Sequence, residues 1–187
     1  MKTGSYLCLL ITLLTGSPAS AQLGQGTSNI QAGGGYTSLI IESTAETANG
    51  FITNGMYEIW LVPKVGIGGS VHFLRVKNES DKGSGVFTSV PLYLNGKYYF
   101  GEGLFRVFVM GSLGVQFSGR KLEDIAGNGG SDNDVGFTGG FGTGVVYTLS
   151  PKVLLNLNYS LYLIKNDYYS NGLANTLSLN LGYILGN

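Results

Sequence analysis

A histidine and a serine that could act together stand two positions apart in the sequence. His72 is the only histidine of the 187-residue chain, and Ser70 precedes it by two positions. The segment around them alternates like a β-strand, in which such positions share one face. An imidazole beside a hydroxyl can activate that oxygen for acyl transfer. Because no acidic residue flanks the pair and its order matches no recognised motif, we favour a histidine packed in an interior or an interface.

Three charged residues fall on the inward face of their predicted strands: Glu58, Lys97 and Arg106. Charged groups enclosed in a protein must pair with one another or meet water. Such a cluster could act as a small ion gate or as a switch inside a barrel. We favour a structural salt-bridge network, because an unpaired charge in an interior is strongly destabilising.

Four acidic residues could bind a metal ion within a polar stretch: Glu123, Asp124, Asp132 and Asp134. Carboxylate oxygens are the ligands that Ca²⁺ prefers. Their spacing matches no calcium-loop template, so we expect a solvated surface loop here. The sequence predicts no metal site, no cofactor and no catalytic residue.

The segments that must position these residues alternate between apolar and polar side chains. This period of two is the signal of a β-strand, and each run is long enough to cross a membrane as a tilted strand. The clearest run has Leu177, Leu179, Leu181 and Tyr183 alternating with Thr176, Ser178, Asn180 and Gly182. We predict strands over 28–41, 55–63, 67–78, 85–100, 104–118, 135–149, 153–166 and 173–186.

The connections between these strands are short at one end and longer at the other. Tight turns are expected at Gly101-Glu102-Gly103 and Ser150-Pro151-Lys152. Longer polar stretches occupy 42–54, 79–84, 118–134 and 167–172. Short turns on one rim and long loops on the other are typical of outer-membrane barrels. The prediction is an all-β, closed, antiparallel up-and-down transmembrane barrel of about eight strands, too narrow for a wide diffusion pore.

Two positions leave the strand count and the register open. Asn95-Gly96 is a strong hairpin signal, and a turn there would split one predicted strand and spoil the even strand count. The length of the chain favours eight strands over ten. We prefer the turn at Gly101-Glu102-Gly103, because alternation continues through Asn95. The segment from Pro63 to Gly69 fits a turn. In the strand that follows it, however, the charged Arg75 falls on the same face as the apolar Val71 and Phe73. A bulge, or emergence of the strand from the membrane before Arg75, would explain it.

The first residues indicate export. Lys2, an apolar run from Tyr6 to Leu14 and the small residues Ala19-Ser20-Ala21 follow the order of a signal peptide. We predict a cleaved signal over 1–21 and one barrel domain over 22–187. An N-terminal membrane anchor is the alternative, although the run is too short to span a bilayer as a helix. Cleavage would remove Cys8, the only cysteine, and with 11 basic and 11 acidic residues no nucleic-acid partner is expected.

Two neighbouring segments carry a family resemblance. Val90 to Phe100 is similar to the fourth strand of small outer-membrane barrels, and Phe105 to Gly114 resembles their fifth. The chain thus resembles the OmpA/OmpX-like barrels, in the form common in Bacteroidota. It departs from them at its end, Tyr183-Ile184-Leu185-Gly186-Asn187, which lacks the terminal aromatic residue used as an assembly signal. We expect an aromatic girdle at the membrane interface from Tyr98, Tyr147, Tyr159, Tyr168, Tyr169 and Tyr183.

These observations favour a porin-like outer-membrane protein of a Gram-negative bacterium with a structural or surface-interaction role and no catalysis. Its expected partners are outer-membrane lipid and lipopolysaccharide, the barrel assembly machinery, and an extracellular ligand bound by the loops. One alternative is a lipid A-modifying, deacylase-like enzyme centred on His72 and Ser70. Another is a soluble exported barrel that carries an apolar ligand.

Overall fold

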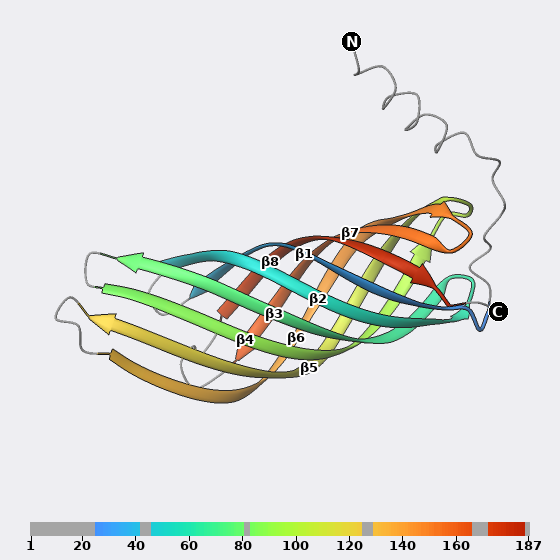
Figure 1. The fold of residues 1–187 in the computed structure, drawn as a ribbon. Helices are drawn as coiled ribbons and strands as arrows, with labels where there is room; N and C mark the ends of the chain where they lie inside the picture. The colour runs from blue at the N-terminus through green and yellow to red at the C-terminus, as the bar shows by residue number, and fades with distance from the viewer. Residues whose placement is uncertain (1–24, 42–45, 81–82, 125–128, 166–171, 186–187) are drawn as a thin grey trace, which may run out of the picture.

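The chain folds into a single closed β-barrel (Figure 1). The computed structural model describes residues 25–41, 46–80, 83–124, 129–165 and 172–185. Eight antiparallel strands each pair with their neighbours in sequence, and β8 pairs back to β1. No helix in these ranges is long and apolar enough to cross a membrane. The strands are β1 (Ser28–Ile41), β2 (Glu46–Val62), β3 (Val65–Ser80), β4 (Gly83–Phe100), β5 (Phe105–Asp124), β6 (Gly129–Ser150), β7 (Val153–Lys165) and β8 (Gly172–Ile184).

The strand count of eight confirms the predicted fold class. Asn95 and Gly96 lie within β4, where they pair with Ser112 and Gly111 of β5, so no turn forms there. The chain reverses instead between β4 and β5, where Gly101 and Gly103 have φ angles of 83° and 85°. Glycine adopts such positive φ angles without the steric penalty that other residues meet.

The two rims of the barrel differ. The turn rim carries the short connections at 63–64, 101–104 and 151–152, and both the start of β1 and the end of β8 lie there. The opposite rim, here called the hairpin rim, carries the other connections. At this rim β3–β4 and β5–β6 project furthest in Figure 1. The strands of these hairpins have 16 to 22 residues, whereas β7 and β8 have 13 each.

The prediction of long loops at this rim was wrong for three of the four stretches. Residues 46–54 belong to β2, and the stretches 79–84 and 118–134 are mostly paired strand. The β4–β5 pairing continues to Gly83↔Asp124, and the β5–β6 pairing continues to Glu123↔Gly129. The stretches 79–84 and 118–134 are rich in polar residues and glycine, so their composition resembles a loop although their backbone is mostly paired as strand. Most of the fourth stretch, 167–172, lies outside the described residues.

The register near Arg75 is unbroken. Val71 pairs with Leu92, and Leu74 with Ser89, at the same offset. A bulge at this point is therefore excluded. Emergence of β3 from the membrane before Arg75 remains the prediction.

Alternate residues face outward and inward around the whole barrel. Two apolar clusters occupy the lumen, one toward each rim, and the side chains between them are mostly polar. The hairpin-rim cluster consists of Leu39, Ala48, Val76, Phe87, Tyr93, Tyr162, Ile164 and Ala174. The turn-rim cluster consists of Trp60, Tyr99, Phe108, Met110, Val146, Leu154 and Ile184. Large apolar side chains are exposed on the outside of every strand, among them Ile30, Phe51, Val71, Leu94, Leu113, Phe141, Leu163 and Leu181.

Candidate functional site

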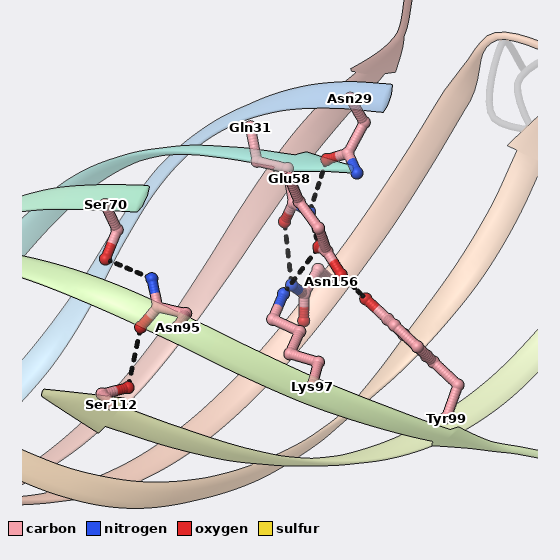
Figure 2. A network of polar contacts seen from close by, with 9 residues as sticks. All are labelled: Asn29, Gln31, Glu58, Ser70, Asn95, Lys97, Tyr99, Ser112 and Asn156. Atoms are coloured by element: carbon pink, nitrogen blue, oxygen red, sulfur yellow. Dashed lines mark hydrogen bonds and ion pairs between the residues drawn. The ribbon is translucent and has the colours of Figure 1, made fainter. Parts of the chain in front are cut away.

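The polar middle of the lumen is organised around one carboxylate. Glu58 of β2 points inward and is 1% exposed. One carboxylate oxygen accepts a hydrogen bond from the Tyr99 hydroxyl at 2.6 Å, and the other lies 3.0 Å from Lys97 Nζ (Figure 2). Gln31 Nε2 donates to the second oxygen at 3.4 Å. The charge of Glu58 is thus compensated by one cation and supported by two neutral donors.

Lys97 completes this centre from β4. Its ammonium group is 4.8 Å from the centre of the Phe108 ring, so it also forms a cation–π contact. Glu58–Lys97 is the one ion pair that the described part of the chain contains. The network extends through Gln31, which donates to Asn29 at 2.7 Å and accepts from Asn156 Nδ2 at 2.8 Å (Figure 2).

Arg106 does not join Glu58 and Lys97, although it also faces inward. It lies near the turn rim, where its guanidinium group donates to the carbonyl oxygens of Gly103 and Pro63, each at 3.4 Å. Of the three predicted lumen charges, the structure therefore brings two together and leaves the third at the end of the barrel.

A second polar chain runs beside this centre. His72 Nε2 lies 3.0 Å from Ser70 Oγ, which also accepts a hydrogen bond from Asn95 Nδ2 at 2.8 Å. Ser112 Oγ donates to Asn95 Oδ1 at 2.7 Å (Figure 2). The sequence-predicted pair of Ser70 and His72 is thus in contact. Asn95, which could have formed a turn by its sequence, links the pair to β5.

The surroundings of His72 are those of a packed core residue. The ring meets Tyr93 and Tyr162 edge-on, with centroids 5.1 and 5.7 Å away. These two tyrosines stack on each other at 4.7 Å. Both His72 and Ser70 are buried and point into the lumen. His72 Nδ1 has no hydrogen-bond partner among the described residues, so no carboxylate orients the ring as a catalytic base requires.

The predicted acidic cluster can be assessed at one position only. Asp134 Oδ1 accepts a hydrogen bond from the backbone N–H of Val135 at 2.7 Å. The side chains of Glu123, Asp124 and Asp132 lie outside the described residues. Within the described residues, no group of three or more histidine, cysteine, aspartate or glutamate side chains could hold a metal ion.

Four of the tyrosines predicted for the girdle point outward, at two levels. Tyr98, Tyr147 and Tyr183 lie near the turn rim, and Tyr159 lies closer to the hairpin rim. Tyr159 also donates to Asn175 Oδ1 at 3.3 Å across the β7–β8 pair. Tyr168 and Tyr169 fall outside the described residues. The position of these rings at a membrane interface remains a prediction.

Several lumen residues were missed from the sequence. Tyr99 and Gln31 contact Glu58, and Tyr93 and Tyr162 contact His72. Their inward parity was readable, because each lies an even number of positions from an inward neighbour on its strand. What could not be read was which strands face one another across the lumen.

Comparisons with known proteins agree with this architecture. Residues 7–184 match the family described as "Outer membrane protein beta-barrel domain". No curated protein matches the sequence. Neisserial surface protein A has a similar structure, with a TM-score of 0.63 and 18% identity over 83% of this chain and 96% of that one.

Ail, the attachment invasion locus protein of Yersinia pestis, is similar as well. Its TM-score is 0.60, with 18% identity over 86% of this chain and 99% of that one. Ail in complex with the heparin analogue sucrose octasulfate gives a TM-score of 0.57 at 20% identity, over 86% of this chain and 99% of that one. At these identities the likeness concerns the fold. The resemblance to small OmpA/OmpX-like barrels is confirmed, and the chain belongs to the outer membrane protein β-barrel domain family.

Proposed function

We propose that this chain is a non-catalytic integral protein of the outer membrane of a Gram-negative bacterium, and that its projecting hairpins bind a partner outside the cell. The observation that carries the proposal is the distribution of side chains. Large apolar side chains cover the outside of all eight strands, and the inside is largely polar. A closed barrel with this arrangement satisfies its backbone hydrogen bonds internally, as a lipid environment demands.

The apolar surface has the height of a bilayer. On β3 the apolar or small outward positions run from Val65 to Phe73 and end at Arg75. This is about the 9 to 11 tilted residues that cross a membrane as a strand. The strands β3 to β6 continue beyond that level, and β6 is nine residues longer than the 13-residue β7. At about 3.3 Å per residue, the extra length of β6 corresponds to about 30 Å of strand.

Barrels of this kind place short turns in the periplasm and long connections outside. By this rule the hairpin rim is extracellular, and β3–β4 and β5–β6 form the surface that a partner would meet. Ail, which has the same fold, binds a sulfated sugar analogue. A barrel of this architecture can thus bind a sulfated ligand. For this chain, the binding test below asks whether heparin or a host matrix protein is the ligand.

The lipid A-modifying alternative requires that a membrane lipid reach His72 and Ser70. Both side chains point into the lumen, and the hairpin-rim cluster packs directly against His72 through Tyr93 and Tyr162. A lipid on the outer surface of the barrel would meet the opposite face of β3. The geometry therefore favours a structural role for the pair.

The soluble-carrier alternative requires the opposite arrangement of side chains. A barrel that dissolves in water and carries an apolar ligand has a polar exterior and an apolar cavity. Here Leu94, Leu113 and Phe141 are 77%, 75% and 76% exposed on the outside. An apolar exterior of this extent favours membrane insertion over solubility.

The first experiment is to fractionate expressing cells and to compare boiled and unboiled samples by electrophoresis. We expect the protein in the outer-membrane fraction, resistant to extraction by alkaline carbonate, with a band that shifts on heating. N-terminal sequencing of the same band tests the predicted cleavage after Ala21. Recovery in the soluble periplasmic fraction without a heat shift would contradict membrane insertion.

A second experiment isolates the β5–β6 hairpin. Replacing residues 122–130 by Asn-Gly leaves the pair Lys121↔Ser131 joined by a two-residue turn. We expect the variant to insert and to shift on heating, but to lose binding of expressing cells to immobilised heparin and host matrix proteins. A companion variant shortens β3–β4, the other half of the proposed surface, by replacing residues 79–84 in the same way. Unchanged binding in both variants would remove the proposed role of the hairpins.

A further inference from the structure

Basic side chains gather on the outside of the barrel wall. Glu79 and Glu123 share the outward parity of Lys77 and Lys121, but their side chains lie outside the described residues. Among the strand side chains that the structure describes, every exposed charged one is basic. Three of these residues lie on neighbouring strands near the hairpin rim: Arg75 and Lys77 on β3, and Lys121 on β5. They are exposed, and none of them forms an ion pair with a described residue. We call these three residues the outer basic cluster.

The strand register sets the spacing of the cluster. Lys77 and Lys121 both pair with Val86 of β4, so they flank it on either side. Two strand spacings separate them, which is about 10 Å. Arg75 lies two residues from Lys77, about 7 Å along the strand. The three cations therefore surround one patch of β4 at a separation that two phosphate groups of one headgroup could span.

A hollow lies within this patch. It has a volume of about 960 Å³ and is lined by Arg75, Lys121 and the Thr88 hydroxyl between them. Gly119 pairs with Thr88 and has no side chain, which leaves room on the surface of β5. Asp134 also lines the hollow, and its Oδ1 accepts the Val135 N–H. The cations thus face an open space that a phosphate group can enter.

The side chains directly toward the turn rim are apolar. Val90, Phe117 and Val135 line the same hollow, and Phe117 and Val135 are 48% and 62% exposed. On β3, Phe73 precedes Arg75 on the outward face. The cluster therefore begins where the apolar surface ends, and it faces sideways from the wall of the barrel. A soluble ligand at the mouth of the barrel would not need an apolar surface beside the cations. A lipid has both a charged headgroup and apolar acyl chains.

We propose that the outer basic cluster binds the phosphate groups of a lipid of the outer leaflet, with the acyl chains of that lipid lying on Val90, Phe117 and Val135. The occupant is a phosphorylated glycolipid of the lipopolysaccharide kind. The proposal rests on membrane insertion in the orientation given above, and it assigns a lipid site to residues of this chain. Each cation near a membrane surface contributes about a five-fold increase in affinity for an anionic lipid.

The test uses the full chain, folded in detergent micelles, and native mass spectrometry to count bound lipid. The probes are lipid A with its phosphate groups and the same lipid A after phosphatase treatment. We expect R75Q/K121Q to weaken binding of the phosphorylated lipid about 25-fold, with no change for the dephosphorylated one. The matched control is K64Q/K152Q, which removes two exposed cations at the turn rim. All variants are exposed-surface changes, and the heat shift on gels verifies their folding.

Three outcomes would overturn the proposal. Equal binding of the phosphorylated and dephosphorylated lipids would remove the phosphate site. Unchanged affinity in R75Q/K121Q, or an equal loss in K64Q/K152Q, would place the site elsewhere. Complete displacement of the lipid by millimolar inorganic phosphate would make the cluster a general anion site. Failure of membrane insertion is measured separately by fractionation, so it is distinguishable from failure of the lipid site.

Discussion

Glu58 and Lys97 form a buried charge pair, and replacing one partner alone costs more stability than replacing both. Both side chains are 1% exposed, and the contact distance is 3.0 Å. Removing one partner leaves the other charge uncompensated, which costs about 3–5 kcal/mol in buried pairs. Replacing both removes that penalty, so the double variant is more stable than the sum of the single effects implies.

The prediction concerns E58Q, K97M and E58Q/K97M. We expect each single variant to lower the free energy of unfolding by about 3 kcal/mol or more, and the double variant to recover at least half of that loss. Urea unfolding in detergent, followed by fluorescence of Trp60, measures the change. Trp60 is the only tryptophan, and its ring centroid lies 5.9 Å from that of Tyr99. The Tyr99 hydroxyl donates a hydrogen bond to Glu58, so Trp60 reports on this region. K152M is the exposed control, and strict additivity of the two single effects would contradict a coupled pair.

The Ser70–His72 pair gives a prediction about chemistry. The pair is in hydrogen-bond contact but faces the lumen and lacks an orienting acid in the described structure. We expect the lipid A of cells expressing the wild-type chain, H72A or S70A to have the same mass spectrum as lipid A from cells with an empty vector. Loss of an acyl chain in wild-type cells, restored in H72A, would instead establish the deacylase alternative.

The sequence showed which face of its strand each charged residue occupies. It did not show how far along the barrel axis the residue lies. Glu58, Lys97 and Arg106 were all placed on the inward face, as the structure has them. Lys97 pairs with Met110, which lies four residues from Arg106 on β5. Four residues are about 13 Å along a strand, too far for an ion pair. The stagger of strands around a barrel decides this distance, and no local pattern in the sequence records it.

At the scale of elements, alternation predicted the strands where one face meets an apolar environment and the other meets the lumen. The predicted bounds of β7 and β8 differ from the observed ones by no more than two residues. The prediction failed where the two faces of a strand lack contrast, as in residues 46–54 of β2, where Phe51 points outward and Ile52 points inward. The same loss of contrast concealed the ends of β5 and β6. A backbone pairing that extends beyond the apolar band leaves no periodic signal.

Two glycines of one strand give a prediction at this scale. Gly114 of β5 faces the lumen, and a Cβ there would overlap with the carbonyl oxygen of Leu92 and lie 2.9 Å from the Tyr93 ring. Gly111 of the same strand faces outward, and a Cβ there would meet no atom within 4 Å. We expect G114A to lower the free energy of unfolding by about 1–3 kcal/mol, and G111A to change it by less than about 0.5 kcal/mol.

The two alanine variants are compared by urea midpoint and by the fraction of the heat-shifted band after refolding. Both add the same methyl group to the same strand, so intrinsic strand preference cancels between them. A loss in G111A as large as that in G114A would mean that β5 resists any side chain. It would contradict the close approach of β4 and β5 as the cause.

At the scale of the whole molecule, the lumen is closed in layers. The turn-rim cluster, the polar middle with Glu58 and Lys97, and the hairpin-rim cluster follow one another along the barrel axis. An eight-stranded barrel is only wide enough for its own side chains to fill the interior. An ion would have to pass two apolar layers, and such constrictions close a pore by excluding water.

The layered lumen predicts that the wild-type protein gives no sustained conductance in a planar lipid bilayer. Y93A/Y162A removes the ring stack of the hairpin-rim cluster, whose centroids are 4.7 Å apart, and should still not conduct because the turn-rim cluster remains. Adding W60A opens the second layer, so we expect only the triple variant to show discrete channel openings. The heat shift of each variant on gels verifies that the barrel stays closed. A defined conductance in the wild-type protein, altered by E58Q, would instead assign the buried pair to an ion gate.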